Sequence, residues 1–162
     1  MTEAMEPWGE TVELKEILAD LLECNQRHVY QEENGMFVDA MYVVLTYTFE
    51  AFDFCPIVYI TSPVSGCGKS TNLDWFEKYC NRPVMAGNIT SSPLFRLMDA
   101  EKPTMLIDEF DSISDPETKK AIMNILNNGF QKGKRVFRSD RGDNGGHSPT
   151  SFDPYGPKVV AC

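Results

Sequence analysis

The chain has 162 residues, of which 42% are hydrophobic, and this is the size of one domain with a proper core. A net charge of −9 and a pI near 4.7 argue against general attraction to nucleic acid or to anionic membranes. The five cysteines form no C-x-x-C pair, and only two histidines are present to help them bind a metal. A reduced, cytoplasmic setting is the simplest account, and the acidic start lacks the apolar core of a signal peptide.

Two helices are predicted at the start of the chain. The first covers residues 11 to about 31, with leucines and an isoleucine at helical spacing, and Asn34-Gly35 is expected to break it. The second covers Met36 to about Phe52 and is apolar on nearly every face, so we expect burial almost all round. Its ten consecutive uncharged residues fall short of the roughly 20 that a membrane span needs. We assign residues 1–54 to this helical segment, packed on a core of residues 55–162.

The stretch Ile57 to Thr71, IVYITSPVSGCGKST, begins as an apolar strand and continues into a turn rich in glycine. Gly66 and Gly68 allow positive φ, so that the amides of Ser65 to Ser70 can point at the same phosphate oxygens. A helix is predicted to follow, from Ser70 to about Cys80. A buried strand, a turn of N–H groups and a helix N-terminus are the parts of a phosphate-binding P-loop, in that order.

Two side chains of the turn would complete such a site. Lys69 supplies a mobile charge for the β- and γ-phosphates, and the Ser70 hydroxyl is placed to ligate Mg²⁺. The template G-x-x-x-x-G-K-[ST] has glycine where this chain has Pro63, so the match is a variant one. A plain strand-to-helix connection with a capping serine is the alternative. The predicted nucleotide contacts are Ser65, Gly66, Cys67, Gly68, Lys69, Ser70 and Thr71.

A second motif, TMLIDE, ends a predicted strand with acidic residues. Asp108 would lie at the carboxyl end of that strand, where ligands of open α/β sheets bind. We expect Asp108 to hold Mg²⁺ directly or through water, and Glu109 to orient and polarise the attacking water. The alternative is that these carboxylates, with Asp111, only end the strand and solvate the loop. Because Lys69 lies 39 residues upstream of Asp108 in a P-loop pattern, we favour Lys69 and Glu109 as catalytic residues.

Strand and helix alternate along the rest of the core. A short strand is predicted around Val84 to Ala86, followed by a helix that Ser92-Pro93 opens. Asp115-Pro116 opens another helix, which Asn128-Gly129 closes. Residues Lys158 to Cys162 have the pattern of a buried strand. The alternation predicts an α/β fold with a parallel sheet and right-handed crossovers.

Residues 132–143 form a basic island in which five cations against two carboxylates give a local charge of +3, leaving −12 on the remainder. The island is a candidate for contact with DNA, and Arg135 or Arg138 is a candidate arginine finger for a neighbouring subunit's nucleotide. A solvated loop is the alternative. Residues 142–150 are predicted as turn and loop, with His147 a solvated histidine. The cations of the island are Lys132, Lys134, Arg135, Arg138 and Arg141.

From about Met36 onward the chain resembles a known family, and five blocks of sequence, in the same order, carry the resemblance. It resembles the P-loop domain of unknown function carried on bacterial plasmids and prophages, whose pattern includes Pro63. The resemblance implies a P-loop NTPase three-layer sandwich of the AAA+ and helicase branch, with ATP contacts at Gly66 to Thr71 and with the Mg²⁺ and water roles at Asp108 and Glu109. The blocks are Thr46 to Phe52, Ile60 to Thr71, Pro103 to Asp111, Ile125 to Gly129 and Gly156 to Lys158.

The resemblance also implies a strand order in which the last strand lies between the P-loop strand and the Asp108 strand. Ile57 to Ile60 would then form an apolar edge unless the N-terminal helices or a partner cover it. Domains of this kind continue past Gly-Pro-Lys into a sensor residue, an arginine finger and a helical lid. We therefore expect a split or truncated ATPase that acts with a complementary chain or further copies. Hydrolysis by the isolated chain should be slow, since arginine fingers contribute about 10³ to 10⁵ in rate.

Three functions stay open on the sequence alone. The first is an ATPase that serves DNA replication or maintenance of a mobile element, and DNA-stimulated hydrolysis would indicate it. The second is a nucleotide-binding switch or interaction module, which would bind MgATP without forming product. The third is a remnant that keeps only the fold, in which Lys69→Ala would change nothing. The preferred base of the nucleotide is not encoded in any recognisable motif.

Overall fold

The computed structural model describes residues 9–62, 66–86, 91–141 and 147–162. The chain begins with helices α1 (Leu14–His28) and α2 (Glu33–Thr48) and a 3-10 turn, η1 (Phe49–Ala51). No helix in the described ranges is long and apolar enough to cross a membrane. The later elements are β1 (Ile57–Ile60), α3 (Lys69–Tyr79), β2 (Pro83–Met85), α4 (Ser91–Glu101), β3 (Thr104–Ile107), η2 (Phe110–Ser112), α5 (Pro116–Asn128), β4 (Val136–Arg141), β5 (His147–Phe152) and β6 (Lys158–Ala161).

Four strands form one parallel sheet in the order β1-β6-β3-β2. Every residue of β3 and β6 is buried, and such continuous burial is typical of parallel strands covered on both faces. The predicted α/β fold with a parallel sheet is confirmed, and so is the predicted place of the last strand between β1 and β3. Because all four strands run the same way, their carboxyl ends meet at one edge of the sheet.

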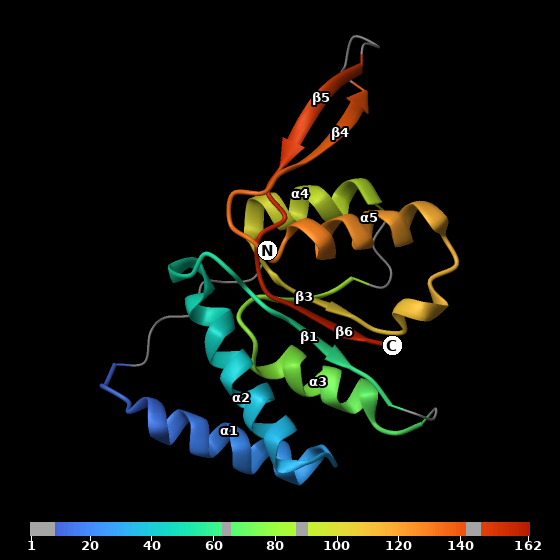
Figure 1. Cartoon of the computed structure of the whole chain (residues 1–162). Coiled ribbons are helices and arrows are strands. Elements are labelled where there is room, and N and C mark those ends of the chain that lie inside the picture. The colour runs from blue at the N-terminus through green and yellow to red at the C-terminus, as the bar shows by residue number, and fades with distance from the viewer. Residues whose placement is uncertain (1–8, 63–65, 87–90, 142–146) are drawn as a thin grey trace.

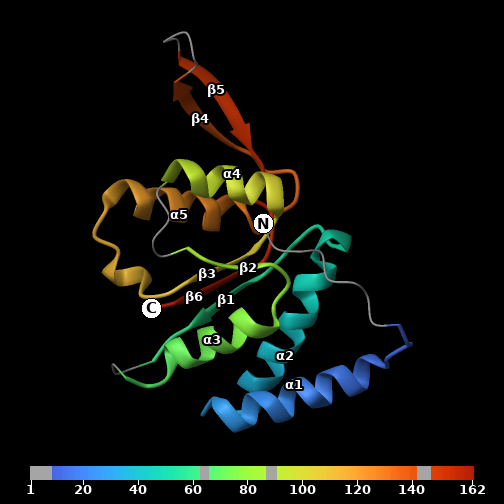
Figure 2. The same cartoon turned by 180° about the vertical axis from the view of Figure 1, so that it is seen from behind.

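Helices cover both faces of this sheet (Figures 1 and 2). On one face α1, α2 and α3 share a hydrophobic cluster with Leu106 and Val159. On the other face α4 and α5 share a second cluster with Met105, Ile107 and Val160. Successive residues of a strand point to opposite faces, so β3 and β6 contribute to both clusters. The predicted domain division between residues 54 and 55 falls between η1 and β1 and stays a prediction.

β1 lies at an end of the sheet, as predicted. Its strand partner is β6, and no other described strand pairs with it. Val58 and Ile60 pack against the cluster under α3, whereas Tyr59 is 56% exposed. β1 is therefore an edge strand of the described sheet, and the face on which Tyr59 lies is only partly covered.

The second helix differs from its prediction in two ways. It begins at Glu33, so Asn34-Gly35 lies in its first turn and the break falls in the residues 29–32 instead. Glycine is less costly in a first turn, where the N–H groups have no helical acceptor. The predicted burial all round is also wrong, because α2 turns one apolar side outward. The side chains that are 42% to 54% exposed are Phe37, Val38, Met41 and Tyr47.

β4 and β5 pair as an antiparallel hairpin that projects from the body beyond α4 (Figure 1). The prediction of a loop is therefore wrong for His147 to Thr150, which belong to β5; residues 142–146 lie outside the described ranges. The stretch HSPTSF carries no apolar alternation, so it lacks the period that identifies a strand. Pro149 is tolerated because both strands of a two-stranded hairpin are edge strands.

α5 has the ends that the sequence predicts. The Asp115 carboxylate accepts the Thr118 N–H at 2.8 Å, Pro116 occupies the first turn, and the helix stops before Gly129. Gly129 has an ordinary φ of −88°, so a left-handed turn does not explain its glycine. A Cβ there would overlap the Pro154 carbonyl oxygen and a lysine nitrogen, so glycine is required for space.

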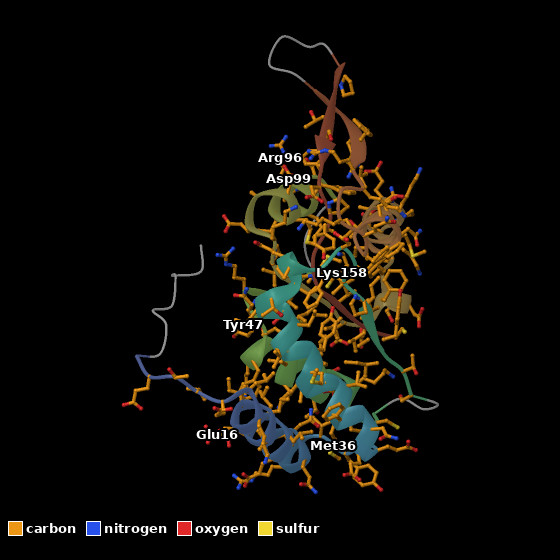
Figure 3. The ribbon with its side chains drawn as sticks, turned by 60° about the vertical axis from the view of Figure 1, so that its left-hand side comes forward. Glu16, Met36, Tyr47, Arg96, Asp99 and Lys158 are labelled. Carbon is orange, nitrogen blue, oxygen red and sulfur yellow. The ribbon has the colours of Figure 1, made fainter. Side chains whose placement is uncertain are left out.

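That nitrogen belongs to Lys158, a fully buried lysine at the start of β6 (Figure 3). Its Nζ donates to the carbonyl oxygens of Gly129 (2.9 Å), Pro154 (3.0 Å) and Gly156 (2.6 Å). Its backbone N–H donates to the Tyr42 hydroxyl at 2.7 Å, which in turn donates to the Lys158 carbonyl at 2.8 Å. Desolvation lowers the pKa of Lys158 to about 7. The lysine ties the loops after α5 and β5 to the central strand and to α2.

Lys158→Met should lower the free energy of unfolding by about 3 kcal/mol or more, because three buried carbonyl oxygens lose their donor. The wild type should also gain stability from about pH 7 to pH 9, since the unfolded lysine, with a pKa of 10.5, keeps a proton that the folded one releases. Above that range the buried Cys55 thiol lowers the stability as the pH rises. Burial raises its pKa to about 11, so the unfolded thiol loses its proton at a lower pH than the folded one. Urea unfolding of both proteins across this range measures the effect, and parallel pH profiles would contradict it.

Candidate functional site

A pocket of about 570 Å³ lies outside the carboxyl ends of three neighbouring strands. Ser62 follows β1, Asp108 follows β3 and Cys162 follows β6. This is where ligands of open parallel sheets bind, and the volume is within the roughly 300–1,000 Å³ of small-molecule sites. The described lining residues are Ser62, Gly66, Cys67, Gly68, Lys69, Ser70, Thr71, Asp108, Glu109, Asp111, Ser112 and Cys162.

The glycine turn forms one wall of this pocket. Gly66 and Gly68 have φ of +79° and +81°, in the left-handed region that favours glycine. A Cβ at either position would meet no heavy atom within 4 Å, so the backbone conformation explains the glycines and crowding does not. Gly68 caps α3, and the N–H groups of the first turn of α3 lie at the pocket. Pro63 and Ser65 lie outside the described residues.

The side chains of the turn present hydroxyls, a thiol and one cation. Lys69 is half-buried, and its Nζ donates to Ser62 Oγ at 3.0 Å, which holds the ammonium group over the turn. Cys67, Ser70 and Thr71 are exposed in the pocket wall. The first turn of α3 contains no acidic residue, so no carboxylate of that turn offsets the positive end of the helix dipole.

Acidic residues form the opposite wall. Asp108 is half-exposed directly after the buried β3, and its carboxylate accepts the N–H of Glu109 at 2.9 Å. Glu109 is exposed, and its φ of 46° and ψ of 45° are left-handed, a conformation that costs a non-glycine residue about 1 kcal/mol. Such strain persists where the surrounding structure imposes it, and it concentrates at functional sites.

The oxygen donors of the pocket fit a magnesium ion that is shared with a substrate. Mg²⁺ in phosphate sites is held by one or two protein oxygens, the phosphates and water. The Ser70 hydroxyl and the Asp108 carboxylate line the same pocket and are donors of this kind. Within the described ranges, no three His, Cys, Asp or Glu side chains gather to hold a metal on their own. Ser70 and Asp108 would need phosphate oxygens or water to complete the coordination of such an ion.

The charges of the pocket are unbalanced. Among the described lining residues Lys69 is the single cation, facing the carboxylates of Asp108, Glu109 and Asp111. A polyanion in this pocket would therefore depend on backbone N–H groups, on Lys69 and on a bound cation to offset the acidic wall.

The cations of the basic island make contacts within their own chain. Its four cations with described side chains each contact a carbonyl oxygen or an aromatic ring of the same molecule. The side chains of Arg141 and His147 lie outside the described part of the chain. The contacts are Lys132 Nζ to the Glu50 carbonyl (2.7 Å), Lys134 Nζ to the Phe130 ring centre (4.6 Å), Arg135 to the Ser151 carbonyl (3.1 Å) and Arg138 to the Phe95 ring centre (4.8 Å).

The hairpin leaves the core at the end of the sheet opposite the pocket. β5 leads into the amino end of β6, whereas Cys162, at the carboxyl end of β6, lines the pocket. Arg135 and Arg138 are therefore not part of the pocket wall of their own chain. An arginine finger that reaches a neighbouring subunit stays a prediction.

Four lining residues were not expected as site residues from the sequence: Ser62, Asp111, Ser112 and Cys162. Cys162 had a recognisable signal, because it is the last residue of a predicted buried strand; in the structure that strand ends at Ala161. Ser62 lies directly before the glycine turn and needs the three-dimensional contact with Lys69 to be identified. Ser112 lies in η2, a short turn that no motif marks.

No protein-family model matches the chain, and no curated protein matches it. The resemblance to the P-loop domain of plasmids and prophages therefore stays an expectation drawn from five blocks of sequence. The function proposed below is argued from the pocket and its residues.

Glu109→Gly should raise the free energy of unfolding by about 1 kcal/mol, because glycine adopts the left-handed conformation without the cost that glutamate carries. Glu109→Gln keeps that backbone cost and should leave the stability nearly unchanged. Urea unfolding of the three proteins measures the difference. Equal stability of the glycine and glutamine variants would show that the backbone at residue 109 is unstrained.

Proposed function

We propose that the chain binds MgATP in this pocket and hydrolyses the bond between the β- and γ-phosphates. The finer fold assignment, a P-loop NTPase three-layer sandwich, belongs to the same proposal. The observation that carries it is the convergence of two sequence motifs on one pocket. The left-handed glycine turn with Lys69 lies on one wall, and Asp108 and Glu109 lie on the other.

The turn is suited to bind the phosphates. Its two left-handed glycines and the first turn of α3 present consecutive N–H groups without helical acceptors. Lys69 is long enough to exchange its contact with Ser62 for a phosphate oxygen, because its Nζ is held by a single described hydroxyl at 3.0 Å. Binding of this kind orients the terminal phosphate toward the acidic wall.

Ser70 and Asp108 are the residues that would hold Mg²⁺. When bound, the ion would neutralise phosphate charge and orient the phosphate oxygens. Glu109 is the candidate general base: its exposed carboxylate would accept a proton from the attacking water. Asp108 also supports Glu109 directly, because its carboxylate accepts the Glu109 N–H at 2.9 Å.

A nucleotide-binding switch with little turnover is the second candidate, and the charge of the pocket favours it. Phosphoryl transfer develops negative charge that arginine fingers commonly stabilise, and Lys69 is the single cation among the described lining residues. Slow hydrolysis by the isolated chain follows from the same observation. A second copy or a complementary chain would have to supply any further cation.

Service to DNA replication or to maintenance of a mobile element is the part of the proposal that depends on the sequence resemblance. Contact with DNA would involve the basic island and the hairpin that carries it. Stimulation of hydrolysis by DNA would support this part, and identical rates with and without single- or double-stranded DNA would remove it.

Thermal unfolding with Mg²⁺ and a non-hydrolysable ATP analogue tests binding. Ligand at 100 times its dissociation constant should stabilise the wild type by about 2.7 kcal/mol, which appears as a higher midpoint. Lys69→Ala should abolish the shift. Lys78→Ala removes an exposed lysine from the last turn of the same helix, outside this pocket, and should keep the shift.

Hydrolysis is tested by phosphate release from ATP. Glu109→Gln should retain the thermal shift and lose about 10²-fold or more in rate, because the candidate base is removed while the binding residues remain. Binding without detectable product in the wild type would favour the switch. No shift in the wild type would overturn the proposal.

A further inference from the structure

A buried carboxylate joins the N-terminal helices to the helix that follows the glycine turn. Asp39 of α2 is 4% exposed. Its Oδ2 accepts hydrogen bonds from Gln31 Nε2 (2.6 Å), Asn72 Nδ2 (3.0 Å) and Asn25 Nδ2 (3.4 Å). These donors belong to the α1–α2 connection, to α3 and to α1. One oxygen atom is thus the common acceptor of three segments.

Asn72 connects this acceptor to the pocket. It directly follows residues 69–71, and its backbone N–H donates to the Gly68 carbonyl at 3.0 Å, which closes the helical turn around them. Its side chain is 4% exposed, and its Oδ1 has no hydrogen-bond partner among the described residues. The described hydrogen bond that orients this amide is therefore the one to Asp39.

Apolar side chains already pack α2 against α3, so the contact between the two helices does not require Asp39. Tyr42 and Phe76 meet edge to face with ring centres 6.1 Å apart, in a cluster that also contains Leu73 and Trp75. Burial raises the pKa of Asp39, and its three amide donors act in the opposite direction. A buried carboxyl group is a costly addition to a contact that apolar residues already make, so a role in orientation accounts for it better than a role in stability.

We propose that Asp39 is a positioning residue for the phosphate-binding turn, acting through Asn72. By fixing the Asn72 side chain it sets the direction of the first turn of α3, which carries Lys69 and Ser70. The N-terminal helices are then part of the nucleotide site although none of their residues lines the pocket. This inference rests on the proposed function.

A double-mutant cycle separates positioning from general stability. The full chain is titrated with a fluorescent non-hydrolysable ATP analogue and Mg²⁺, as wild type, Asp39→Ala, Asn72→Ala and the double variant. Each single variant should lose about tenfold in affinity, a typical cost of removing an orienting partner of a binding residue. The double variant should lose no more than either single variant, because both act through one hydrogen bond.

Tyr47→Phe is the matched control. The Tyr47 hydroxyl donates to the Tyr79 carbonyl at 3.0 Å, so it joins α2 to the last turn of α3. Figure 3 labels Tyr47 near one end of α2 and Met36 near the other, the end from which Asp39 reaches the first turn of α3. Tyr47→Phe removes a contact between the same two helices and should lower the unfolding midpoint slightly without changing affinity.

The inference would be overturned if Asn72→Ala bound the analogue with wild-type affinity. It would also be overturned if the losses of affinity added in the double variant, or if Tyr47→Phe lost as much affinity as the single variants. If Asp39→Ala does not fold, the affinities of Asn72→Ala and Tyr47→Phe are compared instead: a loss in the first and none in the second supports the inference. These outcomes differ from failure of the proposed function, in which the wild type itself would not bind the analogue.

Discussion

The pairing of β6 with both β1 and β3 is the interaction on which the pocket depends. The glycine turn follows β1 and the acidic residues follow β3, so neither motif would be near the other without the strand between them. Parallel pairing places all three carboxyl ends at one edge. At the amino end, Lys158 fixes β6 by three carbonyl contacts and by Tyr42. The geometry of the candidate site is therefore set partly by a residue at the other end of its strand.

Backbone conformation is the second constraint on the site. Both walls of the pocket contain left-handed residues: Gly66 and Gly68 in the turn, and Glu109 after β3. The glycines adopt this conformation at little cost, whereas Glu109 does not. Glu109 therefore carries a local backbone cost, as the left-handed Arg82 and Lys102 do away from the pocket. Asp39 places a buried carboxyl group beside the apolar packing of α2 on α3.

The sequence predicted the parts of the fold whose signals are local. Strand β1, the glycine turn, β3 with Asp108, and the N-terminal cap of α5 each carry their signal within a few residues. The hairpin was missed because HSPTSF lacks alternation, and the exposed side of α2 was missed because helical periodicity cannot identify the uncovered face of an apolar helix. The Asp39 contact joins residues 33 positions apart and depends on helix packing, so no spacing reveals it.

The central place of β6 has a kinetic consequence. Ile57 pairs with Lys158, about 100 residues away, so the closure of this sheet is a non-local step with a large loop entropy. Until β6 inserts, the two walls of the pocket have no fixed separation and cannot bind one ligand together. A ligand that contacts both walls would therefore bind only molecules in which β6 has inserted. If it binds the native state and not the folding transition state, it slows unfolding and leaves the folding rate nearly unchanged, so it prolongs the lifetime of the native state more than it speeds folding.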